Sequence, residues 1–468
     1  MDRKRWLVRY LILAAIGTML VIKLYMMIFV IDFIVGLYSF LTSFILFSIF
    51  FISYTRFSDP FLKAKDVALS NGGPLVSIIV PVKNEEVNIK NCVLSCVNST
   101  YQNKEVIIIN DGSTDKTPEI LDKIRKECSS NIHIIHLSKS VGKKSAIEAG
   151  TQIAKGEIFA FMDSDCDMAN DAVENAVKIF QSDNGIGAIT GHGRVRNAES
   201  KGNILQKIQD VWFDGQFRIL KGMESSFSSL TCCSGALSIF RKSAVQPYMH
   251  QWAHDKFLGI ENFKFATDRR LTAFVLGAKP TSTNNKSDNI DNIPILQTGK
   301  DDLDTMKSSS DPDDEHSKKN LRYSWKVVYS PSVKVNVGVP ENLPTLIRQQ
   351  IRWRKSFIRS IFATGGIYWR RPLPAALLYY LILSLKLLRP IIVIKAVLLL
   401  PLSGDYFTAI LYIVGAMYSA MLYGIDVRLR NPGYTLWLYR PLMTFISTFI
   451  FSWLIIYAAI TIRKSAWR

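Results

Sequence analysis

The stretch Ile158-Phe159-Ala160-Phe161-Met162-Asp163-Ser164-Asp165 decides how the middle of this chain folds. Five apolar residues in a row are typical of a strand that is buried on both faces of a sheet. This strand ends directly in two carboxylates, Asp163 and Asp165, which repel each other unless a cation lies between them. Carboxylate oxygens are the ligands that Mg²⁺ and Mn²⁺ prefer, and these ions also bind phosphate oxygens. The stretch therefore predicts a core strand that delivers a divalent-metal site to the edge of a sheet.

Short β-rich runs and amphipathic helices alternate along the chain around this stretch. Continuous apolar strands separated by helices predict an α/β fold, in which a mainly parallel sheet is covered by helices on both faces. Such a sheet binds its ligands beyond the carboxyl ends of its strands, so chemistry is expected in the loops that follow the strands. The expected strands are 76–81, 105–110, 132–137 and 158–162, and the expected helices are 85–97, 117–127 and 144–154.

Polar residues follow each of the expected strands. A single carboxylate in such a loop is commonly only a helix cap or a turn former, which is how we interpret Thr114 and Asp115. The pair at 163 and 165 differs, because two carboxylates follow a core strand at close spacing. The other candidates are Pro81, Asn84 and Glu85 after the first strand, Asp111 after the second, and Lys143 after the third.

Apolar residues are concentrated near both ends of the chain, although its 468 residues are only 48% hydrophobic overall and 21% charged. A helix needs about 20 apolar residues in succession to cross a bilayer. We expect a retained transmembrane hairpin in residues 1–56, because a second long run follows the first and no small-residue cleavage site separates them. We also expect a C-terminal transmembrane region in residues 373–462. The apolar runs are Trp6–Ile22, Phe33–Tyr54, Leu373–Leu402, Tyr406–Ile425 and Tyr439–Ile462.

Basic residues predict the orientation of these helices. Arg3–Arg5 place the N-terminus inside the cell, so the polar middle would be cytoplasmic and the chain a multi-pass protein of the plasma membrane. Five spans would leave the C-terminus outside, whereas the basic residues at 463, 464 and 468 favour the inside. A re-entrant segment or a split at Pro390 would reconcile the two. Lys386 either snorkels to the interface or lines a polar conduit.

The charge balance and the cysteines exclude several classes of protein. The net charge is +18, and basic residues between 348 and 371 gather just before the third apolar run. They fit a surface that faces anionic lipid and phosphate, and we expect no nucleic-acid partner. The six cysteines include no CxxC pair, so we expect reduced thiols rather than a disulfide scaffold or a zinc site. The stretch 281–322 is polar and nearly free of aromatic residues, which predicts a disordered insertion, with a calcium site as a minor alternative.

Five motifs occur here in an order that resembles family 2 glycosyltransferases, and in particular the processive membrane-bound members of that family. The resemblance covers about residues 74–365 and the layout of the flanking spans. Two departures are Asn110, where the family often has a second aspartate, and Ala266-Thr267 before Asp268, where glycine or an acidic residue usually stands. The five motifs are Pro81–Glu85, Asn110–Ser113, Asp163–Asp165, Thr267–Thr272 and Gln349–Trp353. Three further segments, Cys232–Ala236, Val339–Glu341 and Arg352–Ser356, are similar to hyaluronan synthases and NodC-type chitin synthases.

The resemblance implies a GT-A-type domain in residues 74–335, inserted between the N-terminal and C-terminal membrane helices, and amphipathic interface helices in residues 340–371. It implies that Asp165, with Asp163, holds Mg²⁺ or Mn²⁺. Asp111 would contact the uracil of the donor. The implied UDP-sugar ligands are Pro81, Asn84, Glu85, Asp111, Lys143 and Asp163, and the implied diphosphate and acceptor ligands are Gln349, Arg352, Trp353, Cys233, Ser234 and Gly235.

Asp268 is the catalytic residue that the resemblance implies, as the general base that deprotonates the acceptor hydroxyl. Because Arg269 and Arg270 follow it directly, we expect their charges to favour the ionised carboxylate, so that its pKa is not raised. Attack opposite the leaving diphosphate would invert the sugar and give a β-linkage from an α-linked donor.

The leading hypothesis is a membrane-embedded, processive, inverting glycosyltransferase. It would polymerise UDP-GlcNAc, with or without UDP-GlcUA, into a hyaluronan- or chitin-type polysaccharide and pass the growing glycan across the bilayer. One alternative is a single-transfer enzyme that acts on a polyprenyl phosphate or another lipid acceptor. Another is a degenerate membrane protein that only binds a nucleotide sugar, but the four retained aspartates at 111, 163, 165 and 268 argue against it.

Overall fold

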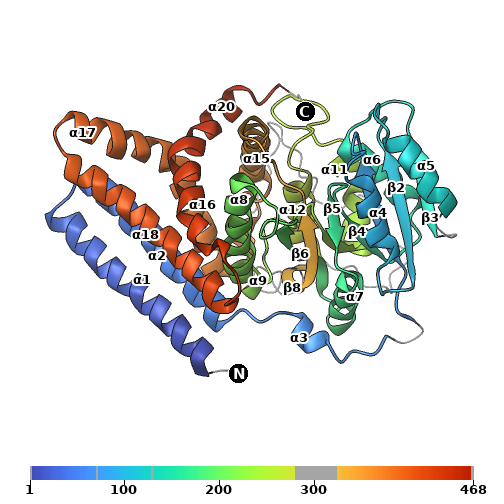
Figure 1. The fold of residues 1–468 in the computed structure, drawn as a ribbon, viewed down its shortest axis with the longest axis horizontal. Coiled ribbons are helices and arrows are strands. Elements are labelled where there is room, and N and C mark those ends of the chain that lie inside the picture. Colours follow the sequence, from blue (N-terminus) through green and yellow to red (C-terminus); the bar gives the residue numbers. More distant parts are fainter. Residues whose placement is uncertain (1–2, 70–71, 128–130, 280–323, 465–468) are drawn as a thin grey trace, which may run out of the picture.

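The structure is a computed structural model that describes residues 3–69, 72–127, 131–279 and 324–464. The insertion predicted at 281–322 lies outside the described residues. Figure 1 shows a sheet at one end of the molecule and long helices at the other, with helices α8 (Ile204–Gly215), α12 (Thr267–Gly277) and α15 (Leu343–Ala363) between them.

One half of the sheet is parallel, as the sequence predicts. Its strands are β1 (Val76–Val82), β2 (Lys104–Asn110), β3 (Ile132–His136) and β4 (Ile158–Phe161), in the spatial order β3-β2-β1-β4. All three pairings within this half are parallel. Each strand begins and ends within one residue of its predicted bounds. The carboxyl ends of these strands therefore lie along one edge.

The other half of the sheet is mixed and continues from β4 in the order β7-β6-β8-β5. Strand β7 pairs antiparallel with both β4 and β6, whereas β6 and β8 are parallel. Strand β5 pairs antiparallel with β8 and so brings the chain just after Asp165 back to the sheet. The bounds are β5 Cys166–Met168, β6 Ile186–Val195, β7 Ser238–Arg241 and β8 Lys326–Val337.

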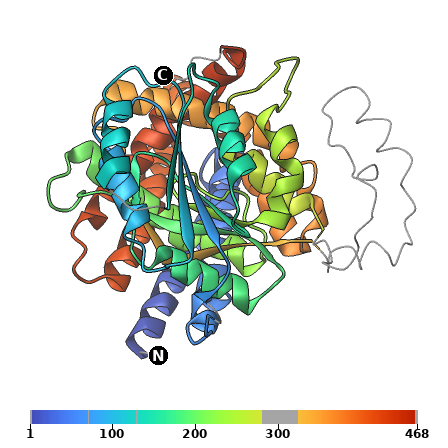
Figure 2. The same cartoon turned by 90° about the vertical axis from the view of Figure 1, so that its right-hand side faces the viewer.

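Helices cover both faces of the sheet, and the strands bury side chains toward both (Figure 2). In β1, Ile78 and Val80 pack into one apolar cluster and Ile79 into the other. Helices α4 (Ile89–Val97), α5 (Thr117–Glu127) and α7 (Ala172–Ser182) belong to the first cluster. Helices α6 (Lys143–Ile153), α10 (Lys242–Val245), α11 (Met249–Ala253) and α12 belong to the second.

Helix α4 starts later than the expected helix 85–97. Asn84, just before the expected helix, has a φ of 53°, in the left-handed region. The amides of Glu85 and Glu86 donate to Thr117 and Asp115, so the expected first turn is a loop. The Asn84 side chain accepts a hydrogen bond from the amide of Thr114 at 2.8 Å, which fixes this turn against the loop after β2. The first loop is therefore held open at the carboxyl end of β1, and α4 begins at Ile89.

Four helices in the described part of the chain are long and apolar enough to cross a membrane: Trp6–Phe29, Phe33–Thr55, Tyr406–Arg430 and Leu436–Ile460. The first two form the predicted hairpin and are the spanning parts of α1 (Arg3–Phe29) and α2 (Phe33–Thr55). Helix α16 (Leu373–Ile394), which carries Lys386, is not among the four. Of the two alternatives for the C-terminal region, a split at Pro390 is contradicted, because α16 continues through that residue.

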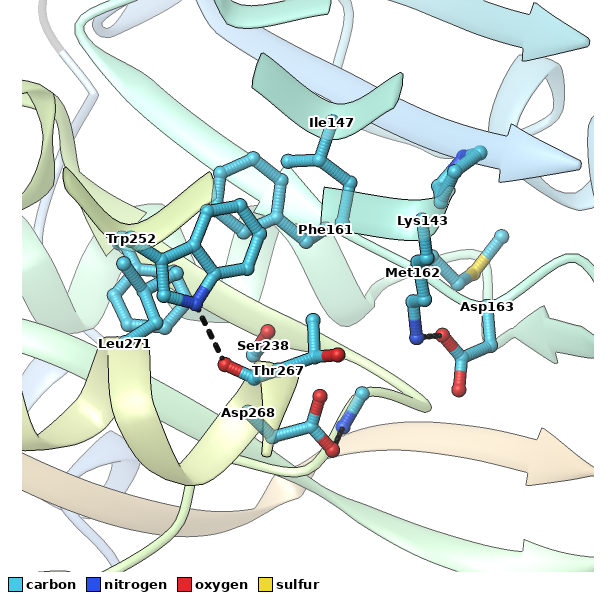
Figure 3. Close-up of a pocket in the computed structure, with 13 residues that line it drawn as sticks. Lys143, Ile147, Phe161, Met162, Asp163, Ser238, Trp252, Thr267, Asp268 and Leu271 are labelled. Atoms are coloured by element: carbon cyan, nitrogen blue, oxygen red, sulfur yellow. Dashed lines mark hydrogen bonds and ion pairs between the residues drawn. The ribbon is translucent and has the colours of Figure 1, made fainter. Parts of the chain in front are cut away.

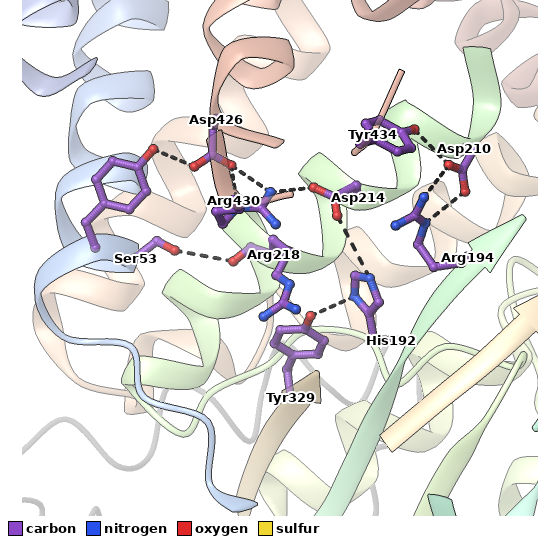
Figure 4. Close-up of polar contacts among 11 residues, drawn as sticks. Ser53, His192, Arg194, Asp210, Asp214, Arg218, Tyr329, Asp426, Arg430 and Tyr434 are labelled. Carbon is purple, nitrogen blue, oxygen red and sulfur yellow. Dashed lines mark hydrogen bonds and ion pairs between the residues drawn. The ribbon is translucent and has the colours of Figure 1, made fainter. Parts of the chain in front are cut away.

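A buried polar network joins the long helices to the sheet domain (Figure 4). Asp214 on α8 accepts a hydrogen bond from Arg430 at the end of α18 (Tyr406–Arg430). Arg430 also donates to Asp426 at 2.7 Å, and Asp426 accepts a hydrogen bond from the hydroxyl of Tyr54 on α2 at 2.7 Å. Because hydrogen bonds shielded from water fix geometry strongly, this network holds α8 against α2 and α18.

Candidate active site

Acidic residues from two separate segments meet beyond the carboxyl end of β4, as Figure 3 shows. Asp163 lies two residues beyond the end of β4, after Met162, and Asp268 lies in the first turn of α12. The backbone of Gly235 connects them: its carbonyl accepts a hydrogen bond from the amide of Asp163, and its own amide donates to Asp268 Oδ2, both at 3.0 Å. The predicted active-site residues 163, 235 and 268 are therefore in direct contact.

Gly235 leaves little room for a side chain. A Cβ atom at this position would lie 3.0 Å from Asp163 Oδ2 and 3.0 Å from Asp268 Oδ1. The glycine therefore lets two carboxylates stand on either side of one peptide. Any larger residue would push at least one of them away.

Lys143 is the cation inside this group of acids. Its ammonium forms an ion pair with Asp163 from the first turn of α6 (Figure 3). Burial alone would lower the pKa of Lys143, but the charges of Asp163 and Asp268 raise it overall, and the charge of Arg352 opposes them. Lys143 therefore stays charged, and Arg352 on α15 lies close enough to act on it.

Asp165 is held mainly through its backbone. Its carbonyl accepts hydrogen bonds from Arg196 at 3.0 Å and from the amide of Gly338 at 3.2 Å. Burial and the negative charge of Asp163 raise the pKa of the Asp165 carboxyl to about 6. A buried carboxylate with a raised pKa next to a second carboxylate fits a divalent cation that prefers oxygen ligands.

The expectation for the pKa of Asp268 is wrong. Burial raises it, the charge of Asp163 raises it further, and Lys143, Gly235 and Arg269 only partly offset this rise. Arg270 does not help, because its side chain turns away and donates to Asp255 at 3.2 Å. A carboxylate with a raised pKa is better suited to accept a proton than a strongly stabilised one.

The donor-loop candidates line the same edge of the sheet. Pro81 lies with Lys143 and Asp163 in the lining of a small cavity. The amide of Glu85 donates to the Thr117 hydroxyl at 2.9 Å, which joins the first loop to the start of α5. The structure thus places Pro81 near the end of β1, and Asn84 and Glu85 in the following loop, which is fixed by hydrogen bonds.

Asp111 supports the loop that leads to Lys143. It is 3% exposed and accepts hydrogen bonds from the Ser140 hydroxyl at 2.8 Å and from the amides of Val141 and Gly142 at 2.6 and 3.0 Å. Gly112 makes this close approach possible: it has a φ of 62°, and a Cβ there would meet the Ser140 nitrogen at 2.7 Å. The observed role of Asp111 is to position 140–142, and the uracil contact stays a prediction.

The turn at 233–235 is held by its backbone amides. Cys233 donates to the Thr272 hydroxyl on α12, and Ser234 donates to the Thr190 hydroxyl on β6, each at 2.9 Å. The Cys233 thiol is fully buried in the apolar core, so its side chain packs there rather than facing a ligand. The turn therefore presents Gly235 to the acids.

Helix α15 carries the three candidates from the fifth motif. The Trp353 ring stacks on Trp212 of α8, with ring centroids 6.1 Å apart and an angle of 18° between the planes. The Gln349 side-chain oxygen is buried and accepts no hydrogen bond within the described part of the chain. This orphaned acceptor is free to bind a hydroxyl or amide of a ligand.

Sequence reasoning missed three residues that shape this site. Trp212 forms the stack with Trp353, Arg196 holds the backbone of Asp165, and the Thr190 hydroxyl fixes the turn before Gly235. Trp212 lies on α8, Thr190 on β6 and Arg196 directly after β6. No motif marks them, since their roles depend on which distant elements they face.

Comparison with known proteins agrees with this geometry. The sequence model of a protein family described as "Glycosyl transferase family 2" matches residues 77–248. The chain carries a family 2 glycosyltransferase domain. The glycosyltransferase is 24% identical to a hyaluronan synthase of Streptococcus pyogenes over 404 residues, which cover 84% of this chain and 82% of that protein. It is 30% identical to a poly-beta-1,6-N-acetyl-D-glucosamine synthase of Staphylococcus aureus (strain COL) over 170 residues, which cover 36% of this chain and 40% of that protein.

Among solved structures, the glycosyltransferase is similar to a mannosyltransferase from Pyrobaculum calidifontis in complex with GDP-Man and Mn²⁺. The TM-score is 0.49 and the identity 18%, over 90% of this chain and 99% of that one. The predicted family and the expected GT-A-type sheet between apolar helices are confirmed. The enzyme is a glycosyltransferase with the helices of a membrane protein.

Proposed function

We propose that this glycosyltransferase is a processive, inverting enzyme of the plasma membrane with its catalytic domain in the cytoplasm. It joins UDP-sugars, UDP-GlcNAc with or without UDP-GlcUA, into a β-linked polysaccharide of the hyaluronan or chitin type and passes it across the bilayer. The observation that carries the proposal is the convergence of Asp163, Asp165 and Asp268 with Lys143, within electrostatic reach of Arg352 on α15. The similarity to a hyaluronan synthase over 84% of the chain supports the polymer.

The donor would bind with its diphosphate at the carboxyl end of β4. Asp165 and Asp163 would hold Mg²⁺ or Mn²⁺, which would supply Lewis-acid stabilisation of the leaving diphosphate. Lys143 and Arg352 bring two further positive charges to the same place, and the arginine fork suits phosphate oxygens. Asp111 keeps the 140–142 loop in position beneath the nucleotide and, in the family's manner, contacts the uracil.

Transfer requires the acceptor hydroxyl to lose its proton as it attacks. Asp268 is held by the Gly235 amide through Oδ2, which leaves Oδ1 to face the acceptor. Its raised pKa suits a group that accepts this proton. Since the acceptor approaches from the side opposite the diphosphate, the donor carbon inverts and the product linkage is β.

Repeated transfer requires the chain end to stay bound near the membrane helices. The paired indoles of Trp353 and Trp212 offer a flat apolar surface on which a sugar ring can stack. The Gln349 side-chain oxygen, which accepts no hydrogen bond from any described residue, offers an acceptor on the same helix. These two features support an acceptor site that holds the glycan between additions.

The test is synthesis by the detergent-purified full chain with UDP-GlcNAc, with and without UDP-GlcUA, in Mn²⁺. A long product that chitinase or hyaluronidase digests supports the proposal. A single added sugar, or label that partitions into the lipid extract, would favour the lipid-acceptor alternative. Calorimetry of UDP with Asp165→Ala checks the metal site separately: metal-dependent binding should disappear.

A further inference from the structure

Three potential metal-ligand side chains meet on the surface at the junction of α6 and α11. Glu148 comes from α6, His250 from α11, and His254 caps the end of α11. The two histidines are one helical turn apart, with the His254 amide bonded to the His250 carbonyl at 3.0 Å. His250 Nδ1 lies 2.9 Å from Glu148 Oε1, and His254 Nδ1 lies 3.7 Å from Glu148 Oε2. All three donor atoms lie within 4.8 Å of one another.

These distances suit one metal ion. Ligand atoms that bind zinc at about 2.0–2.2 Å lie no more than about 4.4 Å apart, so only a small rotation of the side chains is needed. Without an ion, His254 Nδ1 also lies 3.1 Å from the carbonyl oxygen of His250, and metal binding would replace that contact. Two imidazoles and one carboxylate favour Zn²⁺ and its transition-metal neighbours over Mg²⁺, which prefers oxygen ligands.

The three side chains differ in exposure: the carboxylate is mostly buried and the two imidazoles are exposed. The Glu148 side chain is 12% exposed, whereas those of His250 and His254 are 84% and 44% exposed. The carboxylate is therefore fixed in the junction, and the imidazoles can close over an ion that arrives from solution. The exposed side leaves a coordination position for water.

The junction lies directly above buried charged residues. Lys144, one turn before Glu148 on α6, lies 3.5 Å from Asp255, the residue after His254. Helix α6, which carries Lys144 and Glu148, also begins with Lys143, the partner of Asp163. An ion at the surface would therefore connect α11 to α6. The buried contact between Lys144 and Asp255 already connects the same two segments beneath it.

We propose that Glu148, His250 and His254 form a binding site for Zn²⁺ or a similar transition-metal ion, separate from the Asp163 and Asp165 site. The ion joins α6 to α11. The site is a structural clamp and takes no part in sugar transfer.

The experiment measures bound zinc in the full-length chain, purified in detergent without a histidine tag, loaded with Zn²⁺ and freed of excess ion. We expect one zinc bound at this site and a higher midpoint of thermal unfolding in its presence. The H250A/H254A double variant and E148Q should lose this zinc and the thermal shift. Affinity should fall by at least about 100-fold, since even residues that only support a ligand are worth about 10–100-fold.

Two controls separate this site from the rest of the molecule. His133 also lies beside a carboxylate, 3.9 Å from Glu105, so H133A removes a histidine of similar surroundings and should keep the zinc. D165A alters the acidic site and should keep it as well. Equal zinc content in wild type and H250A/H254A, or loss of the zinc in D165A, would overturn the proposal.

Discussion

Two buried charged clusters lie next to each other in this glycosyltransferase, and adjacent residues serve different ones. Lys143 pairs with Asp163, whereas Lys144 lies against Asp255. Helix α12 divides its residues in the same way, because Asp268 faces Gly235 while Arg270 bonds to Asp255. The active-site cluster has more acids than ion-paired cations, and the Asp255 cluster has more cations than acids.

The Asp255 cluster joins three helices that carry active-site residues. Arg359 on α15 donates to both carboxylate oxygens of Asp255, at 2.8 and 3.1 Å, and Arg270 and Lys144 bond from α12 and α6. All four side chains are at most 5% exposed. The carboxylate thus fixes the helices that present Lys143, Asp268 and Arg352 relative to one another.

The two clusters differ in what satisfies their charges. Asp255 has its counter-charges inside the protein, so its cluster stabilises the fold. The carboxylates at 163, 165 and 268 are held near one another with raised pKa values at two of them, which leaves negative charge for a ligand cation to neutralise. Carboxylates that lack enough cations inside the protein mark the functional site, and a carboxylate fully paired with cations marks its support.

Replacing the proposed base should give the largest effect. Asp268→Asn keeps the size of the side chain but removes its capacity to accept a proton, so the rate of sugar transfer should fall by about 10²–10⁴-fold. UDP binding and the midpoint of thermal unfolding should stay close to wild type, because the residue is not a support. A turnover within a few-fold of wild type would remove Asp268 from its proposed role.

Replacing the acid of the supporting cluster should unfold the enzyme more readily. Asp255→Asn leaves three buried cations without a carboxylate, which should lower the free energy of unfolding by about 3–5 kcal/mol at pH 7. Thermal or denaturant unfolding in detergent measures this loss. An Asp255→Asn variant as stable as wild type would contradict the comparison of the two clusters.

The difference in stability between wild type and Asp255→Asn should depend on pH. Burial would raise the pKa of Asp255, but the hydrogen bonds from Arg359 and the charges around it lower it overall. A carboxyl whose pKa is lowered by folding stabilises the protein above the unfolded pKa, and this stabilisation is lost as the pH falls below about 4. Wild type and Asp255→Asn should therefore approach each other in stability at acidic pH.

Adding a side chain at position 235, between the two carboxylates, should have a smaller effect on catalysis. Gly235→Ala would place a Cβ 3.0 Å from oxygens of both Asp163 and Asp268, so one carboxylate must move. A misplaced catalytic group costs up to about 100-fold in rate, and we expect a loss of about 10–100-fold with little change in thermal unfolding. Gly277→Ala, at the other end of α12, is the control, since its nearest contact is Ile367 at 3.6 Å and its activity should be unchanged.

The sequence predicts the parallel half of the sheet and the motif residues well because both depend on local patterns. Apolar runs give β1 to β4 to within one residue, and helix α5 has the predicted bounds, Thr117–Glu127. Residues that follow those strands must meet at one edge, so the convergence of the loops follows from the order of strands alone.

The rest depends on contacts between distant parts of the chain. Strand β8 joins the sheet beside β6 from more than 130 residues away, which no local pattern specifies. Arg270 shows the same limit within the site: its position next to Asp268 suggests a partner, but the helix turns it toward Asp255. Which face of α12 packs inward is decided by its contacts with α15 and with the sheet strands β6 and β8. The pKa of Asp268 could therefore not be inferred from its neighbours in sequence.

Removing one cation from the Asp255 cluster should have the smallest effect. Lys144→Met keeps the apolar stem and loses a hydrogen bond to the Phe263 carbonyl at 2.9 Å, worth about 1 kcal/mol. Burial lowers the pKa of Lys144 to about 8 despite the charge of Asp255, so folding disfavours the charged lysine. Removing this charge therefore offsets part of the stability that is lost with the hydrogen bond. Asp255 still keeps Arg270 and Arg359.

In the unfolded chain Lys144 stays protonated up to about pH 10. Wild type should therefore gain stability between about pH 8 and 10 as the folded state releases this proton first, and Lys144→Met should lack that gain. Unfolding midpoints across this range measure the difference, and a Lys144→Met variant as unstable as Asp255→Asn would mean that the cluster has no excess of positive charge.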